Sequence, residues 1–354
     1  MQRDIKIDSA SIPVQFMYEN YLKDKYVVNR KYQRKLVWSI QEKEAFIDSL
    51  MRQYSVLLFL FAEDLDSGSE RMEIIDGMQR MNAIISFIEN EFSIDYNGIK
   101  YFFDLDTLAS TKALKDSGKI KQRVPVYDRE ECARFVSYPL PVSNLTADSK
   151  SIETVFRRIN SFGRQLSEQE IRMAGAVGGL PALVRQISSE IRGDVSRDDR
   201  MNLRDMSKIS LSSYRLKYGI YLPDVFGVKN KIISIRNIRT SRDEELISQV
   251  LAYILLGSNT EPTKTTIDEL YHYESKGDKF EIVDDSIEKY GADKIKDNVL
   301  TVHNMFKKIA DDSNIPLRDI IYKNNKADSI FRSYQVLFLA VYELVIEEGL
   351  RKVN

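Results

Sequence analysis

The chain has 354 residues, of which 43% are hydrophobic and 30% are charged, a composition typical of folded globular proteins. Its formal net charge of −1 gives no overall attraction to nucleic acid, so any such binding requires a local basic patch. The single cysteine, Cys132, excludes an internal disulfide and a multi-cysteine zinc site, and the only histidines, His272 and His303, exclude a histidine-rich metal centre.

The N-terminal region has no apolar signal-peptide core, and no apolar run in the chain approaches the roughly 20 residues that span a bilayer. We therefore expect a cytoplasmic protein with no membrane partner. Residues 12–26 are predicted to contain a short helix. The S-x-x-E form of residues 39–42 is a capping box, which predicts the start of the next helix.

Several short strands are predicted in the first part of the chain. Residues 56–62 form an apolar run of strand length, and residues 72–76 form a second strand that turns back from it. Asn97-Gly98 suits a type I′ turn and predicts a further hairpin. Strands are also predicted at 124–127 and at 134–142, the latter at a sheet edge because it contains two prolines.

After about residue 146 the apolar spacing becomes almost wholly helical. Ser167–Glu170 and Ser241–Glu244 are further capping boxes, and the helix opened by the first is expected to end near Gly178-Gly179. We predict an α+β fold with two domains, an α/β domain at residues 1–146 and an all-helical domain at residues 147–354.

The first candidate site is the turn at Asp76-Gly77, between a predicted strand and a helix that begins at Met78. Free backbone N–H groups and the positive dipole end of such a helix suit a phosphate, with Gln79 and Arg80 in the first turn beside it. A carboxylate at this turn would repel the phosphate unless Mg²⁺ lies between them, so Asp76 would bind metal or position water. The alternative interpretation is that Asp76 is an ordinary N-cap.

Two other segments are candidates with equally ordinary alternatives. Arg34 can bind phosphate bidentately, or it can belong to a solvated basic loop beside a buried Trp38. Asn160 follows an arginine pair near the end of a helix, where it is either part of a site or a simple C-cap.

A basic region extends from Arg197 to Arg242, with eleven Lys and Arg residues against four Asp residues. Interleaved tyrosines make it a candidate nucleic-acid surface, for which we select Arg215, Lys217, Arg236 and Arg239. The alternative is a set of solvated helix faces balanced by acidic residues from the last third of the chain.

Taken together, the ordered segments resemble one family. Tyr32-Gln33-Arg34 with Val37-Trp38, then Ile75 to Arg80, then Phe156 to Gly163 and Leu166 to Arg172 are similar to the N-terminal domain of GmrSD-type, modification-dependent restriction enzymes, relatives of the ParB and sulfiredoxin fold. The family signature Asp-Gly-Gln-Gln-Arg falls on Asp76 to Arg80, and Met78 replaces its first Gln. A thioether cannot donate a hydrogen bond, so Met78 weakens hydrolysis if that Gln acts in the site and is harmless if it faces the core.

The resemblance implies a Mg²⁺-dependent module that binds and hydrolyses a nucleoside triphosphate in defence against phage or foreign DNA. It implies catalytic roles for Asp76, Gln79 and Arg80, a metal-binding role for Asp76, and nucleotide binding by Gln33, Arg34, Gly77, Arg80 and Asn160. An HNH nuclease domain needs more histidines, so DNA cleavage would come from a separate nuclease or effector subunit or from the ParB-like domain itself. A non-catalytic DNA-binding or assembly subunit is the alternative function.

Overall fold

The computed structural model describes residues 5–30, 33, 35–63, 70–162, 167–173, 176, 178–194, 200–214, 216, 219–257, 262–271, 278–321 and 327–349. These residues fold into two compact units. The first comprises residues 1–158 and 198–210, and the second comprises residues 159–197 and 211–354.

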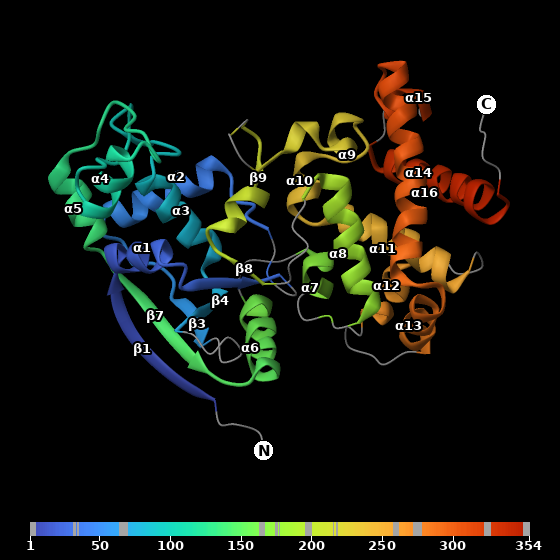
Figure 1. Ribbon diagram of the computed structural model, residues 1–354, viewed down its shortest axis with the longest axis horizontal. Helices are drawn as coiled ribbons and strands as arrows, with labels where there is room; N and C mark the ends of the chain where they lie inside the picture. Colours follow the sequence, from blue (N-terminus) through green and yellow to red (C-terminus); the bar gives the residue numbers. More distant parts are fainter. Residues whose placement is uncertain are drawn as a thin grey trace. The chain divides into compact units, whose positions relative to one another are not determined.

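The first unit is built on a mixed six-stranded sheet with the order β1-β7-β3-β4-β2-β8. The β1–β7, β3–β4 and β2–β8 pairs are antiparallel, whereas the β3–β7 and β2–β4 pairs are parallel. The strands are β1 (Lys6–Pro13), β2 (Tyr26–Asn29), β3 (Phe59–Glu63), β4 (Met72–Asp76), β7 (Pro139–Thr146) and β8 (Arg200–Asn202). With the largely helical region that follows, this sheet confirms the predicted α+β fold (Figure 1).

The strand expected at the sheet edge differs from the prediction in both extent and position. Helix α5 (Arg129–Val136) occupies the first part of that segment, and β7 begins only at Pro139. β7 also lies inside the sheet, between β1 and β3. Its prolines are tolerated because β3 pairs with β7 only from Val142 onward, so Pro139 and Pro141 precede that ladder.

Local turn and capping signals in the first unit are confirmed. Ser39 and Glu42 form a complete capping box at the start of α2 (Ile40–Met51). The Asn97-Gly98 turn joins β5 (Ile94–Tyr96) to β6 (Ile99–Tyr101), with φ values of 53° and 82° that suit the type I′ class. The strand predicted at 124–127 is wrong, since this segment makes only an isolated bridge from Val126 to Phe102.

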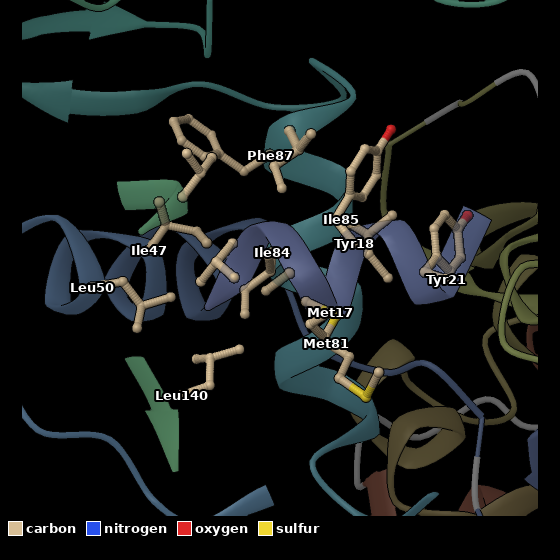
Figure 2. Packing of buried hydrophobic residues seen from close by; sticks show 14 of the residues in the cluster. Met17, Tyr18, Tyr21, Ile47, Leu50, Met81, Ile84, Ile85, Phe87 and Leu140 are labelled. Atoms are coloured by element: carbon tan, nitrogen blue, oxygen red, sulfur yellow. The ribbon is translucent and has the colours of Figure 1, made fainter. Parts of the chain in front are cut away.

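Helix α3 (Met78–Ile88) lies at the centre of the first core, with nine of its eleven residues buried. Figure 2 shows Met81, Ile84, Ile85 and Phe87 of α3 among side chains from α1 (Val14–Leu22), α2 and β7. The first unit also contains α4 (Ala109–Asp116) and, up to Arg158, the helix α6 (Ser149–Phe162). Because α3 is packed on nearly all sides, the turn that precedes it is held on a rigid element.

The second unit is largely helical. Its described helices include α7 (Glu168–Met173), α8 (Gly179–Arg192), α9 (Phe226–Lys229), α10 (Ile235–Arg239), α11 (Arg242–Leu256), α12 (Lys264–Leu270), α13 (Asp278–Tyr290), α14 (Ala292–Ser313), α15 (Leu317–Ile321) and α16 (Ala327–Tyr342). α6 (Ser149–Phe162) precedes them, and β9 (Leu211–Ser212) and β10 (Ile220–Tyr221) form a short parallel pair. α8, α11, α13, α14 and α16 enclose the second core.

The capping box at Ser167 is confirmed by reciprocal hydrogen bonds with Glu170. The helix that it opens ends at Met173, and Gly178 is instead the N-cap of α8. The capping box at Ser241 is wrong, because Ser241 has a φ of +55° and its side chain makes no capping hydrogen bond. Within the described residues, no helix is both long enough and apolar enough to cross a membrane.

Candidate functional site

The turn from β4 into α3 is made by Gly77, whose φ is +108°. A side chain is strained in this conformation, and a Cβ here would lie 2.5 Å from Cδ1 of Phe59. Gly77 is also the N-cap residue, so the first turn of α3 has no side-chain cap among the described residues. The interpretation of Asp76 as the helix cap is therefore wrong, and its carboxylate has a different role.

That role involves Arg80, whose side chain is only 9% exposed. Nη2 of Arg80 donates to Oδ2 of Asp76 at 2.6 Å and to the carbonyl of Leu58 at 3.0 Å. Nη1 donates to the carbonyl of Leu57, and the guanidinium lies over the ring of Phe59 at 4.4 Å. Burial lowers the pKa of Arg80 and the charge of Asp76 opposes this effect, although an arginine stays protonated in either case. Arg80 therefore joins the β4–α3 turn to the residues that lead into β3.

Two glutamines attach the segment around residues 33–38 to the same turn. Nε2 of Gln33 donates to the carbonyls of Ile74 and Ile75, at 2.9 and 2.8 Å. Gln79 accepts from the backbone N–H groups of Val37 and Trp38 through Oε1 and donates to the carbonyl of Lys35 through Nε2, at 2.8–3.2 Å. These five hydrogen bonds are all made by uncharged side-chain amides, which hold the segment in place.

The structure thus brings together Gln33, Asp76, Gly77, Gln79 and Arg80 at one turn. Of these, Asp76 has a side chain that is 42% exposed, and Arg80 engages only one of its oxygens. The described residues contain no group of three or more His, Cys, Asp or Glu side chains that would hold a metal ion by themselves. A lone carboxylate fits Mg²⁺ only when other oxygens, such as phosphate oxygens, complete its coordination.

Met78 is 3% exposed and belongs to the hydrophobic core of the first unit. Its side chain therefore faces the core, where a thioether packs well. The departure from the family signature at this position removes no hydrogen-bonding group from the exposed side of the turn.

Other predicted residues cannot be placed at this turn. Arg34, Arg215 and Lys217 lie outside the described residues. Asn160 is in the last turn of α6, but its side chain is not among those described.

The basic region is divided between the two units, and much of its charge is neutralised. Of its eight basic residues that the structure describes, six pair with carboxylates, as follows: Arg200 with Glu73, Arg204 with Asp24, Lys208 with Asp205, Lys229 with Asp311, Lys231 with Asp319, and Arg242 with Glu245. Only Asp205 of these partners lies within residues 197–242. Arg236 is exposed on α10, and Arg239 donates to Oγ of Ser213 at 3.1 Å.

The sequence did not predict that Phe59 packs against Arg80, or that the carbonyls of Leu57 and Leu58 accept hydrogen bonds from it. The run at residues 56–62 was visible as an apolar segment, but its first residues lie outside β3, where their carbonyls are free of the sheet ladder. Leu57 is 77% exposed and Leu58 is 45% exposed, which is unexpected in an apolar run. No local pattern indicates that an arginine more than twenty residues later would bind these carbonyls.

Comparison with known families gives one match. The family described as GmrSD restriction endonuclease, N-terminal domain, matches residues 17–176. The match includes the whole β4–α3 turn and the segment that Gln33 and Gln79 attach to it. No curated protein matches the chain.

Proposed function

Because residues 17–176 belong to the GmrSD restriction endonuclease N-terminal domain family, we propose that the chain binds and hydrolyses a nucleoside triphosphate in a DNA restriction or defence system. The observation that carries this proposal is the start of α3, which no side chain of the described residues caps, directly beside the half-exposed carboxylate of Asp76. Backbone N–H groups at the start of a helix bind phosphate. A neighbouring carboxylate can bind a metal ion, or position a water molecule, that acts on that phosphate.

The contacts around the turn support distinct roles for the residues. The N–H groups of the first turn of α3 would bind phosphate oxygens, whereas the missing side chain of Gly77 leaves room for the buried ring of Phe59. Gln33 and Gln79 would act as positioning residues, since their amides are occupied by backbone groups. Arg80 would fix the orientation of Asp76 through their ion pair, and the role of Arg34 in phosphate binding stays a prediction.

Mg²⁺ fits this scheme as an ion shared between the protein and the nucleotide. Asp76 would be its protein ligand, and the ion would neutralise charge on the phosphate oxygens. Oδ2 of Asp76 accepts from Arg80, so among the described residues Oδ1 is the oxygen that remains for the metal or for water.

A thermal-shift screen of the full chain against the common nucleoside triphosphates, with and without Mg²⁺, tests the binding step. A ligand present at 100 times its Kd stabilises the native protein by about 2.7 kcal/mol, which a melting curve resolves. Asp76→Asn should reduce the shift. The matched control is Asp48→Asn, because Asp48 also pairs with an arginine four residues later and is 41% exposed. Absence of a shift with every triphosphate refutes the proposal.

A second candidate function, a non-catalytic DNA-binding or assembly subunit, is favoured by the exposure of Arg236 on α10. Within the described part of the chain, Arg236 makes no ion pair. Fluorescence anisotropy with duplex DNA across a salt series separates the two functions, because phosphate contacts give a steep salt dependence. A ParB-type nuclease is tested by nicking of supercoiled plasmid, and a separate nuclease or effector subunit would supply cleavage if none is seen.

A further inference from the structure

A cavity of about 50 Å³ lies inside the second unit, far along the chain from the β4–α3 turn. Residues of α8, α11, α14 and α16 line it, together with residues from the α9–α10 region. Much of the lining is apolar and includes Phe226, Val250 and Phe338. An apolar cavity of this kind gains stability when an apolar group fills it.

Three residues that line the cavity carry polar atoms that break this apolar pattern. Oγ of Ser188, Nε of Arg192 and Oδ1 of Asp243 are buried and have no hydrogen-bond partner among the described residues. A buried polar atom without a hydrogen-bond partner destabilises the folded protein, so three such atoms on residues that line one cavity are unusual. Together they offer a donor, an acceptor and a hydroxyl that can act as either.

The charges at this cavity define which ligands it accepts. Nη1 of Arg192 donates to Oδ2 of Asp243 and lies 3.3 Å from Oε1 of Glu244, so one guanidinium faces two carboxylates. Burial by itself lowers the pKa of the Arg192 guanidinium. The two nearby carboxylates have the larger combined effect, so its pKa is raised. An anionic ligand would add to an existing excess of negative charge and is excluded.

His303 adds no positive charge to compensate. Its ring packs edge-on against Phe226 with centroids 4.6 Å apart, and burial lowers its pKa to about 4. The imidazole is therefore neutral at physiological pH and forms part of the wall of the cavity.

We propose that this cavity binds a small neutral molecule with a primary amide or alcohol group at one end and a short apolar chain at the other. The polar group would accept from Nε of Arg192 and donate to Oδ1 of Asp243, while the chain packs against Phe226 and Phe338. Ordered water would satisfy the polar atoms but leave the apolar lining unfilled. A cavity of roughly 150 Å³ accommodates benzene, so this smaller one suits a ligand of a few heavy atoms.

Ligand-observed NMR with propionamide, 1-propanol and propionate tests the proposal on the full chain. We expect saturable binding of the amide or the alcohol and none of propionate, which matches propionamide in shape but carries a charge. Binding should be independent of nucleoside triphosphates, so its outcome is separate from that of the proposed function.

Two variants connect binding to the cavity. Ser188→Ala removes a hydroxyl that has no partner among the described residues and that would also bond the polar group of the ligand. It should leave the melting temperature unchanged or higher and weaken binding of the amide about three- to tenfold. Ile233→Phe, at a partly buried position of the lining, should abolish binding by filling the space, with the melting temperature confirming that the variant folds.

Three results overturn the proposal. The first is the absence of saturable binding by both the amide and the alcohol to the folded wild-type protein. The second is binding that neither variant changes, which places the ligand elsewhere. The third is a crystal structure, grown with saturating propionamide, that has only ordered water in the cavity.

Discussion

Replacing Gly77 with alanine tests whether the turn into α3 depends on close packing as well as on its backbone conformation. A φ of +108° costs an L-residue about 1–2 kcal/mol. The new Cβ would also lie 2.5 Å from the buried ring of Phe59, and overpacking of a core typically costs about 1–3 kcal/mol. We therefore expect Gly77→Ala to lower the free energy of unfolding of the first unit by about 2–5 kcal/mol.

Gly98→Ala is the matched control, because Gly98 has a φ of +82° and a Cβ there would meet nothing within 4 Å. Gly98→Ala should lower the free energy of unfolding only by the cost of the backbone conformation, about 1–2 kcal/mol. Urea unfolding followed by fluorescence of Trp38, the only tryptophan, reports on the first unit selectively. The double variant Gly77→Ala/Phe59→Leu should lose less free energy of unfolding than the two single variants lose in sum, because the smaller side chain at 59 relieves the contact with the new Cβ. Equal losses at Gly77 and Gly98 would refute the packing argument.

The remaining predictions concern one ion pair, one buried acid and one surface arginine. Arg80→Lys should destabilise the first unit by about 2–4 kcal/mol in urea unfolding, since one lysine ammonium cannot bond two carbonyls and Asp76 together. The exposed control Arg52→Lys should leave the urea midpoint close to that of the wild type. Burial raises the pKa of Glu89 from 4.5 to about 7, so the folded state binds more protons than the unfolded state between these values. The free energy of unfolding should therefore fall by about 3 kcal/mol as pH rises through this window. Glu89→Gln should remove that part of the pH dependence, and an unchanged pH profile would contradict it. Arg236→Glu should reduce the salt slope of any DNA binding by about 1–2, and an unchanged slope would exclude α10 from the interface.

Features of the first unit that depend on adjacent residues could be predicted from the sequence. The capping box at Ser39, the Asn97-Gly98 hairpin and the strand–Gly77–helix order all follow from short-range chemistry. The failed capping box at Ser241 shows the limit of such signals. Its residue types are right, but the chain enters α11 with a φ of +55° at that serine, so the hydroxyl makes no capping bond.

Features set by distant parts of the chain could not be predicted. β8 pairs with β2 across more than 170 residues of sequence, and β7 is placed inside the sheet by β1. At the candidate site, residue types pointed to the turn, but the partners of Gln79 and Arg80 are backbone groups elsewhere in the fold. Backbone carbonyls and N–H groups are the same at every position, so a sequence carries no direct sign of which side chain will bind them.

Phosphate release is the reaction expected if the turn between Asp76 and α3 acts on a nucleoside triphosphate. The full chain should release phosphate from at least one triphosphate in Mg²⁺ and stop when the metal is chelated. Asp76→Asn should slow release on the order of a hundredfold or more, whereas Asp48→Asn should match the wild type. Release that both variants retain equally, or no release from any triphosphate, would contradict the account.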